Sequence, residues 1–446
     1  MPTLSELRRC FEGAVPAVID TCAPDGTPNV AYLSQVHYVD DAHVALTFQF
    51  FNTTRKNILA NPRAVTQVID PATAAHWRLQ LEYLRTETEG PLFEKMKAKL
   101  AGIASHSGMS KVFRLLGSDV YRVLAIEPVF GGEAAPDAPR QHLLPSLRAC
   151  LAGLTGCSDL AGLFDACLQG LEQHCDIRHA MLLMHDAAQG RLYTVATRGY
   201  AESGVGSEIR IGEGIIGVAA RERTPIRIGY AAQEYLYSRA VRDGFERSAG
   251  ADGLETVIPF PGLAASGSQL AVPLWYGERL LGALYVESPQ EMRFGYEDED
   301  ALVVLAGQLA MYIELLSHTA EHHEEAAVTR VPPAVQGPPA GIKHFTADHS
   351  VFIDNDYLIK GVAGAIFWKL VRDYVEAGRN EFTNRELRLD PTLKLPDVSD
   401  NLEARLILLQ RRLAERCSVV NIEKTGRGRF RLNVARPLLL TEVPGR

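Results

Sequence analysis

The chain has 446 residues, a formal net charge of -8, 46% hydrophobic residues and 22% charged residues. This length allows about two to four domains, and the composition argues against a fibrous or largely disordered protein. No run of about 18 apolar residues is apparent, and the N-terminus lacks the apolar core of a signal peptide, so we expect no transmembrane span and no secretion. Seven cysteines without a close C-x-x-C pair favour reduced thiols and a cytoplasmic protein.

Two stretches rich in glycine and proline divide the sequence into three blocks. We place the first block at residues 1–130, a linker at 131–145, the second block at 146–318, a helix end with a Pro-rich linker at 319–342, and the third block at 343–440. The first block predicts a small antiparallel barrel, with strands over 17–21, 29–39, 43–50, 64–70, 77–89 and 120–128 and helices over 55–60 and 91–116.

The second block begins with two amphipathic helices and continues with strands over 180–186, 192–197, 269–274 and 281–286. A long helix is expected from residue 297 to about 325. The third block is helix-rich, with helices over 366–375 and 400–416, and ends in a hairpin over 419–434. The fold class that these elements predict is multidomain α+β.

An anion site is predicted where the first block passes from a strand to a helix, in the run F-F-N-T-T-R-K-N-I-L-A-N-P from Phe50 to Pro62. Free backbone N–H groups and the positive end of the helix dipole favour a phosphate there. The candidate ligands of that phosphate are Thr53, Thr54, Arg55 and Lys56.

The same run, together with D-G-T-P-N-V-A-Y-L and W-R-L-Q-L-E, resembles the pyridoxamine 5'-phosphate oxidase-like, FMN-binding split barrel over about 120 residues. The resemblance implies that Thr54, Arg55 and Lys56 grip the phosphate of FMN or a related flavin. Asn29 stands where the oxidases of that family carry an arginine, and no Arg/His-rich substrate signature follows the barrel. Flavin binding without oxidase chemistry is therefore expected, with no cofactor, haem or a deazaflavin as alternatives. We interpret His37, His43 and His76 as packed or surface residues.

The second block resembles a GAF domain in I-R-I-G-E-G-I-I-G-V-A-A-R-E-R-T-P-I-R-I and in S-Q-L-A-V-P-L-W-Y-G-E-R-L-L-G-A-L-Y-V-E-S. Gly212, Gly214 and Gly217 suit a tight turn that starts a helix. The long segment from Gly229 to Ser268 is expected to cover the ligand pocket that this family implies. Its candidate ligand-binding residues are Tyr230, Tyr235, Tyr237 and Arg239. A lid without a ligand is the alternative.

Three further patterns of the second block have simple structural interpretations. Its four cysteines are spaced too widely for a typical metal site, so we expect them to pack in helix interfaces. His318 and His322 are interpreted as part of a solvated helix end, and we predict no metal site. An apolar stripe on the long helix suggests pairing with a second copy, and hence a homodimer; its residues are Leu302, Leu305, Leu309, Tyr312 and Leu316.

The third block resembles the winged-helix domain of bacterial response regulators, most clearly in I-E-K-T-G-R-G-R-F-R-L of the hairpin. Thr383 and Glu386 form a predicted capping box at a helix start. Between Asp400 and Arg436 there are nine cations and four acids, a surplus of five that suits a DNA backbone. The candidate DNA-binding residues are Arg405, Arg411, Arg412, Lys424, Arg427 and Arg429.

One feature favours a different partner for this helix. Ile407 and Leu408 lie where the resemblance implies polar side chains that read bases, and apolar groups there suit burial against another domain or subunit. A winged helix that binds protein is therefore the alternative to DNA binding.

These patterns together predict a cytoplasmic one-component transcriptional regulator. A flavin-binding barrel and a GAF domain would sense a redox or small-molecule signal, and a winged helix would bind DNA. No Ser-His-Asp, metal-ligand or Walker-type pattern identifies catalytic residues. The alternatives are an FMN-dependent oxidoreductase regulated by its GAF domain and a scaffold without a ligand.

Overall fold

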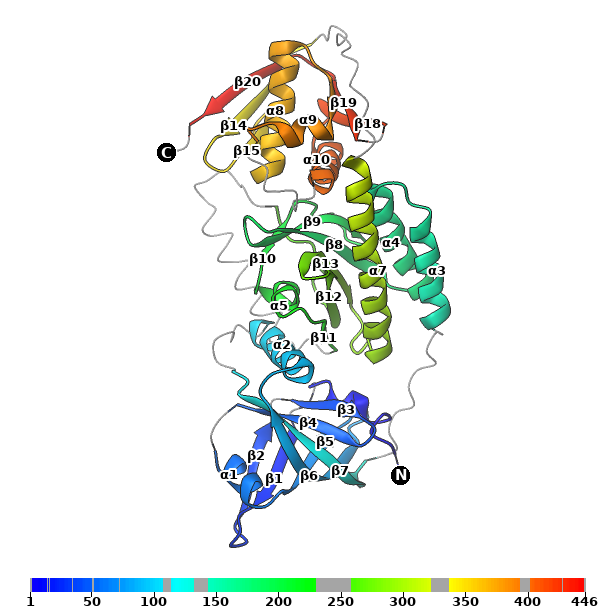
Figure 1. The fold of residues 1–446 in the computed structure, drawn as a ribbon, viewed down its shortest axis with the longest axis vertical. Helices are drawn as coiled ribbons and strands as arrows, with labels where there is room; N and C mark the ends of the chain where they lie inside the picture. Colours follow the sequence, from blue (N-terminus) through cyan, green and yellow to red (C-terminus); the bar gives the residue numbers. More distant parts are fainter. Residues whose placement is uncertain are drawn as a thin grey trace.

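The computed structural model is an elongated stack of three blocks in chain order (Figure 1). It describes residues 2–13, 15, 17–33, 35–49, 52–71, 73–106, 114–131, 143–229, 258–321, 337–393, 402–426 and 428–444, with backbone alone for 101–106 and 318–321. The chain is multidomain α+β, and nearly all of its strand pairs are antiparallel.

The first block is a seven-stranded antiparallel sheet in the order β2-β1-β5-β6-β7-β4-β3. Alternating burial along β1 and β5 places one face of the sheet on the core, as the period of two requires. Register shifts between β6 and β7 mark bulges, which let the longest strands bend around that core. The elements are a 3-10 helix Arg8–Phe11, β1 Ala17–Cys22, β2 Pro28–Leu33, β3 Val36–Asp40, β4 His43–Phe48, α1 Thr53–Ala60, β5 Arg63–Ile69, β6 His76–Glu87, α2 Pro91–His106 and β7 Gly117–Phe130.

Helix α2 joins the first block to the second (Figure 1). Its buried Phe93 and Met96 pack in a cluster with β4 and β7 of the first block. Ala98 is instead buried in a cluster formed by α5 and the sheet of the second block. One short helix therefore contributes side chains to two cores.

The second block is a six-stranded antiparallel sheet in the order β10-β9-β8-β13-β12-β11. Helices α3, α4 and α7 cover one face, and α5 covers the other. The strands β8, β12 and β13 are buried almost throughout because both faces are covered. The elements are α3 Leu143–Thr155, α4 Leu160–Cys175, β8 His179–Asp186, β9 Arg191–Arg198, β10 Glu208–Arg210, α5 Gly214–Glu222, β11 Ile226–Ile228, β12 Ser268–Tyr276, β13 Arg279–Ser288 and α7 Tyr296–Glu321.

Helix α7 is a core helix of the second block, which changes the interpretation of its apolar stripe. Leu302, Leu305 and Leu309 are buried against the sheet and against α3 and α4. The stripe is therefore covered within the chain and does not need a second copy to bury it. By length and composition the window Tyr296–Ser317, with mean hydropathy of 1.5, is apolar enough to cross a membrane. Its buried stripe explains that apolarity without a bilayer.

The third block contains two small sheets around a helical core. One has the order β16-β15-β14-β20, where β20 runs parallel to β14, and the other has the order β17-β19-β18. Thr383 caps α9, because its Oγ1 accepts a hydrogen bond from the Glu386 backbone at 3.2 Å. The elements are β14 Ala340–Phe345, β15 Ser350–Ile353, β16 Asp356–Ile359, α8 Gly361–Ala377, β17 Glu381–Thr383, α9 Asn384–Leu389, α10 Leu402–Arg416, β18 Val420–Gly426, β19 Arg429–Val434 and β20 Leu438–Val443.

Several elements differ from the sequence-based expectation. The strand expected over 29–39 is two strands, β2 and β3, which lie at opposite ends of the sheet order. The helix expected over 91–116 is described only to His106. Strand β20 was not predicted, since it needs a distant partner, β14, to form.

Candidate functional site

The predicted anion site is a narrow cleft at the start of α1. Asn52 caps the helix, because its side chain accepts a hydrogen bond from the Arg55 backbone at 3.0 Å. Thr53 and Lys56 are exposed, whereas Thr54 is buried and its Oγ1 accepts a hydrogen bond from the Asn29 amide at 2.9 Å. Thr54 and Arg55 line the cleft. Of the four predicted phosphate ligands, two therefore lie in the wall of the cleft and two are exposed to solvent.

The Arg55 guanidinium already has a partner within the barrel. Its Nη1 lies 2.6 Å from Oδ1 of Asp119, which also accepts a 2.5 Å hydrogen bond from Thr86. Burial raises the pKa of Asp119, and Thr86 and Arg55 only partly offset it. The guanidinium also lies 4.6 Å from the centre of the Phe48 ring. A phosphate at this site would share Arg55 with an internal carboxylate.

The size and lining of the cleft fit a phosphate group but not a whole flavin. Its volume is about 70 Å³, against the roughly 300–1,000 Å³ typical of pockets for drug-sized ligands. The side-chain amide of Gln49 lines the cleft and has no hydrogen-bond partner among the described residues. A polar group of a ligand could therefore form a hydrogen bond with it. An isoalloxazine ring would need the cleft to widen beside Tyr32, whose side chain is 85% exposed.

A buried ionic cluster, which no sequence pattern revealed, joins the first and second blocks. Arg227 of β11 contacts Glu12 at 2.6 Å and Glu299 at 3.0 Å. Lys99 of α2 lies 3.5 Å from Glu12, and Lys95 lies 2.8 Å from Glu299. Burial alone would raise the pKa of Glu12, but Arg227 and Lys99 outweigh it and hold that pKa below its usual value.

His37 lies beside this cluster, and its burial is the main reason that the imidazole stays neutral. Burial, together with the charges of Lys99 and Lys95, lowers the pKa of His37 to about 3. The side chain is 5% exposed, and its Nδ1 has no hydrogen-bond partner among the described residues. His37 is thus a packed histidine in a positively charged surrounding.

A cavity of about 570 Å³ opens next to the cluster, between the N-terminal segment and the start of α7. Its lining carries six carboxylates and four guanidiniums, and several of them pair with one another, as Arg293 does with Asp298 at 3.3 Å. The cavity is lined by residues of the first and second blocks, and its acids outnumber its guanidiniums by two.

Helix α10, which the resemblance implies would enter DNA, lies against the second block (Figure 1). Arg405 is 4% exposed, and its Nη2 lies 2.8 Å from Oδ2 of Asp186 at the end of β8. Its guanidinium also stacks on Tyr193 of β9, 4.1 Å from the ring centre. Arg411 donates hydrogen bonds to Asp165 at 2.7 Å and to the Val195 carbonyl at 3.0 Å.

The other predicted DNA-binding residues that the structure describes also have interaction partners within the chain. Lys424 lies 2.8 Å from Asp159, the cap of α4. Arg412 is buried and donates to the Leu358 carbonyl of its own block, and burial lowers its pKa. Arg429 also has an interaction partner. Arg427 lies outside the described residues. In this arrangement the described candidate cations therefore do not form an open basic surface.

The apolar residues of α10 explain this contact. Ile407 and Leu408 are 5% and 3% exposed. Leu408 lies beside Gly206, in the connection between β9 and β10, with its Cδ1 3.5 Å from where a Cβ would stand. For Leu408 the environment is the one of the sequence alternative, burial against a neighbouring domain, whereas Ile407 is buried without a GAF contact of its own being shown.

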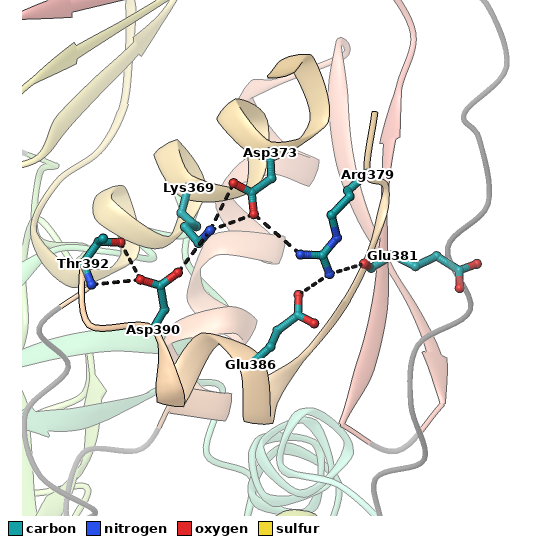
Figure 2. Close-up of polar contacts among 7 residues, drawn as sticks. All are labelled: Lys369, Asp373, Arg379, Glu381, Glu386, Asp390 and Thr392. Carbon is teal, nitrogen blue, oxygen red and sulfur yellow. Dashed lines mark hydrogen bonds and ion pairs between the residues drawn. The ribbon is translucent and has the colours of Figure 1, made fainter. Parts of the chain in front are cut away.

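A charged network fixes α9 against α8 within the third block (Figure 2). Lys369 of α8 lies 2.8 Å from Asp373 and 3.0 Å from Asp390, which follows α9. Arg379 lies 2.8 Å from Glu386 of α9. Lys369 is partly buried, which opposes its charge, but the two aspartates raise its pKa above the ordinary value. These ion pairs therefore hold α9, the helix before α10, against α8.

The predicted ligand-binding residues and the cysteines of the second block are placed differently by the structure. Tyr230, Tyr235, Tyr237 and Arg239 lie outside the described residues. Cys150, Cys167 and Cys175 are free thiols buried between helices, with Cys150 and Cys175 sulfurs 3.7 Å apart. Among the described residues no three of His, Cys, Asp and Glu gather as a metal-binding group.

Residues 157–314 match the GAF domain family model, which confirms that assignment for the second block. No functionally curated protein matches the chain.

Several solved structures resemble parts of the chain. An FMN-binding protein from Syntrophomonas wolfei subsp. wolfei is 19% identical, with 28% of this chain and 85% of that chain covered and a TM-score of 0.25. The GAF domain of an Acinetobacter phosphoenolpyruvate-protein phosphotransferase is 21% identical, with 41% and 96% covered and a TM-score of 0.31. Free methionine-R-sulfoxide reductase from Neisseria meningitidis is 18% identical, with 40% and 91% covered and a TM-score of 0.30. Likeness at this level says nothing of bound ligands.

Proposed function

We propose that this chain is a sensory transcriptional regulator in which the barrel and the GAF domain receive a signal and the third block binds DNA as a winged helix. The observation that carries the proposal is the direct contact of α10 with the GAF sheet, through Arg405 and Asp186 at 2.8 Å. A change in the GAF domain would reach α10 without an intervening linker. The hairpin β18–β19 follows α10, as the resemblance to the winged helix requires.

The DNA-binding part is tested with the purified full chain. Genomic fragments enriched by the protein are measured for affinity at several salt concentrations, since phosphate contacts make log K fall linearly with log salt. Replacing Arg427 and Arg429 by alanine should weaken binding and flatten the salt slope. A chain that enriches no fragment at low salt contradicts the proposed output.

For the barrel we propose a phosphorylated flavin as the signal carrier, with its phosphate at the cleft of α1. Thr53 and Lys56, both exposed, and Arg55, in the cleft wall, are the residues that would hold the phosphate. A bound flavin would supply redox chemistry, and the residues at the start of α1 would hold its phosphate. The test is absorbance in the flavin bands after purification and after reconstitution with FMN; a protein that stays colourless in both contradicts this part alone.

We also propose a homodimer, on a different surface from the one expected. Helix α7 leaves Val304 and Met311 on its outer side, 48% and 54% exposed, while its leucine stripe is buried. Sedimentation equilibrium of the full chain and of Met311→Glu tests this surface. A wild-type monomer, or a dimer unaffected by the charge, would contradict it.

A further inference from the structure

We infer that the GAF domain sequesters the DNA-binding face of the third block, so that the arrangement described above is the closed, non-binding state of the regulator. The inference rests on the proposed DNA-binding role and adds its regulation. The evidence is an interface in which cations of α10 and of the hairpin are matched by acids of the GAF domain.

Five ion pairs join cations of the third block to acids of the GAF domain, and four of them involve α10 or the hairpin. Two of the acids lie at the ends of the GAF core elements, Asp159 at the start of α4 and Asp186 at the end of β8. The pairs are Arg405–Asp186 at 2.8 Å, Arg411–Asp165 at 2.7 Å, Arg416–Glu202 at 3.2 Å and Lys424–Asp159 at 2.8 Å. A fifth contact, Lys360–Glu208 at 3.4 Å, lies beside them.

The contact with the GAF domain neutralises most of the positive charge that DNA would need. Residues 400–436 carry a surplus of five positive charges, and four GAF carboxylates reduce the surplus to one. A DNA backbone would have to replace those carboxylates, because the same guanidinium cannot face both at once. Leu408, buried beside Gly206, also occupies the face that a recognition helix presents to the major groove.

The contact has an exposed polar rim around an apolar centre that is continuous with the cores of both domains. Its rim is hydrated: the side chains of Asp165 and Glu202 are 67% and 82% exposed, so those pairs are weak and screened by salt. Only Arg405 and Asp186 are both buried. Meanwhile Arg412 pins α10 to its own block through the Leu358 carbonyl, so α10 leaves together with the third block rather than alone.

The test uses charge reversal at the exposed rim of the full chain. The double variant Asp165→Lys, Glu202→Lys repels Arg411 and Arg416, and neither substituted side chain is buried. The matched control is Glu291→Lys, Asp300→Lys, at exposed sites around the start of α7, which changes the net charge equally. Hydrogen exchange of α10 and β9 reports opening, and fluorescence anisotropy with a random-sequence 40-base-pair duplex reports DNA affinity.

The expected result is faster exchange in α10 and at least tenfold tighter DNA binding for the rim variant than for the control. Faster exchange with equal DNA affinity in rim variant, control and wild type overturns the sequestration and leaves DNA binding standing. Faster exchange with no DNA binding in any of them overturns the DNA-binding role itself. Unchanged exchange shows that these pairs do not hold α10, and overturns the sequestration as well.

Discussion

The Nη1 atom of Arg227, on β11 of the GAF domain, lies 2.6 Å from Oε1 of Glu12, in the N-terminal segment of the barrel block. Both side chains are almost fully buried, at 3% and 6% exposure. A buried ion pair contributes little net stability by itself, but removal of one partner leaves an uncompensated charge in a medium that cannot solvate it. The junction between barrel and GAF domain is therefore sensitive to single substitutions.

Glu12→Gln should lower the free energy of unfolding by about 3 kcal/mol, toward the lower end of the range for a broken buried pair because Glu299 still faces Arg227. Urea unfolding at pH 7 measures the change. Glu6→Gln, at an exposed position of the same segment, is the control and should be neutral. Equal stability of the two variants would show that the cluster does not stabilise the junction.

His37 should make stability fall on mild acidification. Its pKa is lowered to about 3 in the folded chain, against about 6.5 when unfolded. The unfolded chain therefore binds the extra proton between these values, and stability is lost as pH falls below about 6.5. From pH 7 to pH 5 this one site should cost about 2 kcal/mol.

Chemical denaturation at both pH values, in wild type and in His37→Gln, measures that contribution. The variant should lose less stability between pH 7 and pH 5, since it lacks the group that titrates. His174→Gln, at an exposed position of α4, is the control and should behave as wild type does. An identical pH response in all three proteins would contradict the assignment.

Gly217→Ala should destabilise the GAF domain severely. A Cβ at residue 217 would lie 2.3 Å from the Arg210 carbonyl oxygen, and neither backbone can retreat without breaking the turn before α5. Gly307→Ala on α7 is the control, since a Cβ there meets nothing within 4 Å. It should be neutral or stabilise by up to about 1 kcal/mol through helix propensity. Thermal unfolding ranks the two, and a reversed order would contradict the packing described.

Lys56→Ala should weaken FMN binding by about tenfold without changing the unfolding free energy, because the exposed ammonium would contribute about 1.4 kcal/mol of phosphate contact. Arg55→Ala should lose both binding and stability, since it also leaves Asp119 buried without its cation. Flavin fluorescence titration and urea unfolding measure the two effects, with the exposed Arg63→Ala as control. Unchanged FMN affinity in both variants would place the phosphate elsewhere.

Local patterns predicted local structure well. The spacing of Thr383 and Glu386 predicted a helix start, and the capping hydrogen bond is present. The glycines of G-E-G-I-I-G predicted a tight turn, and Gly212 and Gly214 do adopt positive φ, at 90° and 58°. Such features depend on neighbours a few residues away, which a sequence displays directly.

Partner choice across the chain could not be predicted in the same way. Arg55 was correctly placed at a helix start, but its carboxylate partner Asp119 is 64 residues away. The cations of α10 suggested an open basic face, whereas their partners belong to another domain. The available signal was the pair Ile407 and Leu408, because apolar groups on a face expected to contact DNA indicate a protein neighbour.

Helix α2 belongs to the barrel by sequence, yet its Ala98 is part of the same apolar cluster as Ile216 and Ile228 of the GAF domain. Replacing the first block by another domain would remove α2 from its contacts with α5 and β11, and would uncover part of this apolar cluster. The first block and the GAF domain therefore have to be transplanted as one unit. Chimaeras that exchange the sensor have to carry α2 along with the GAF half.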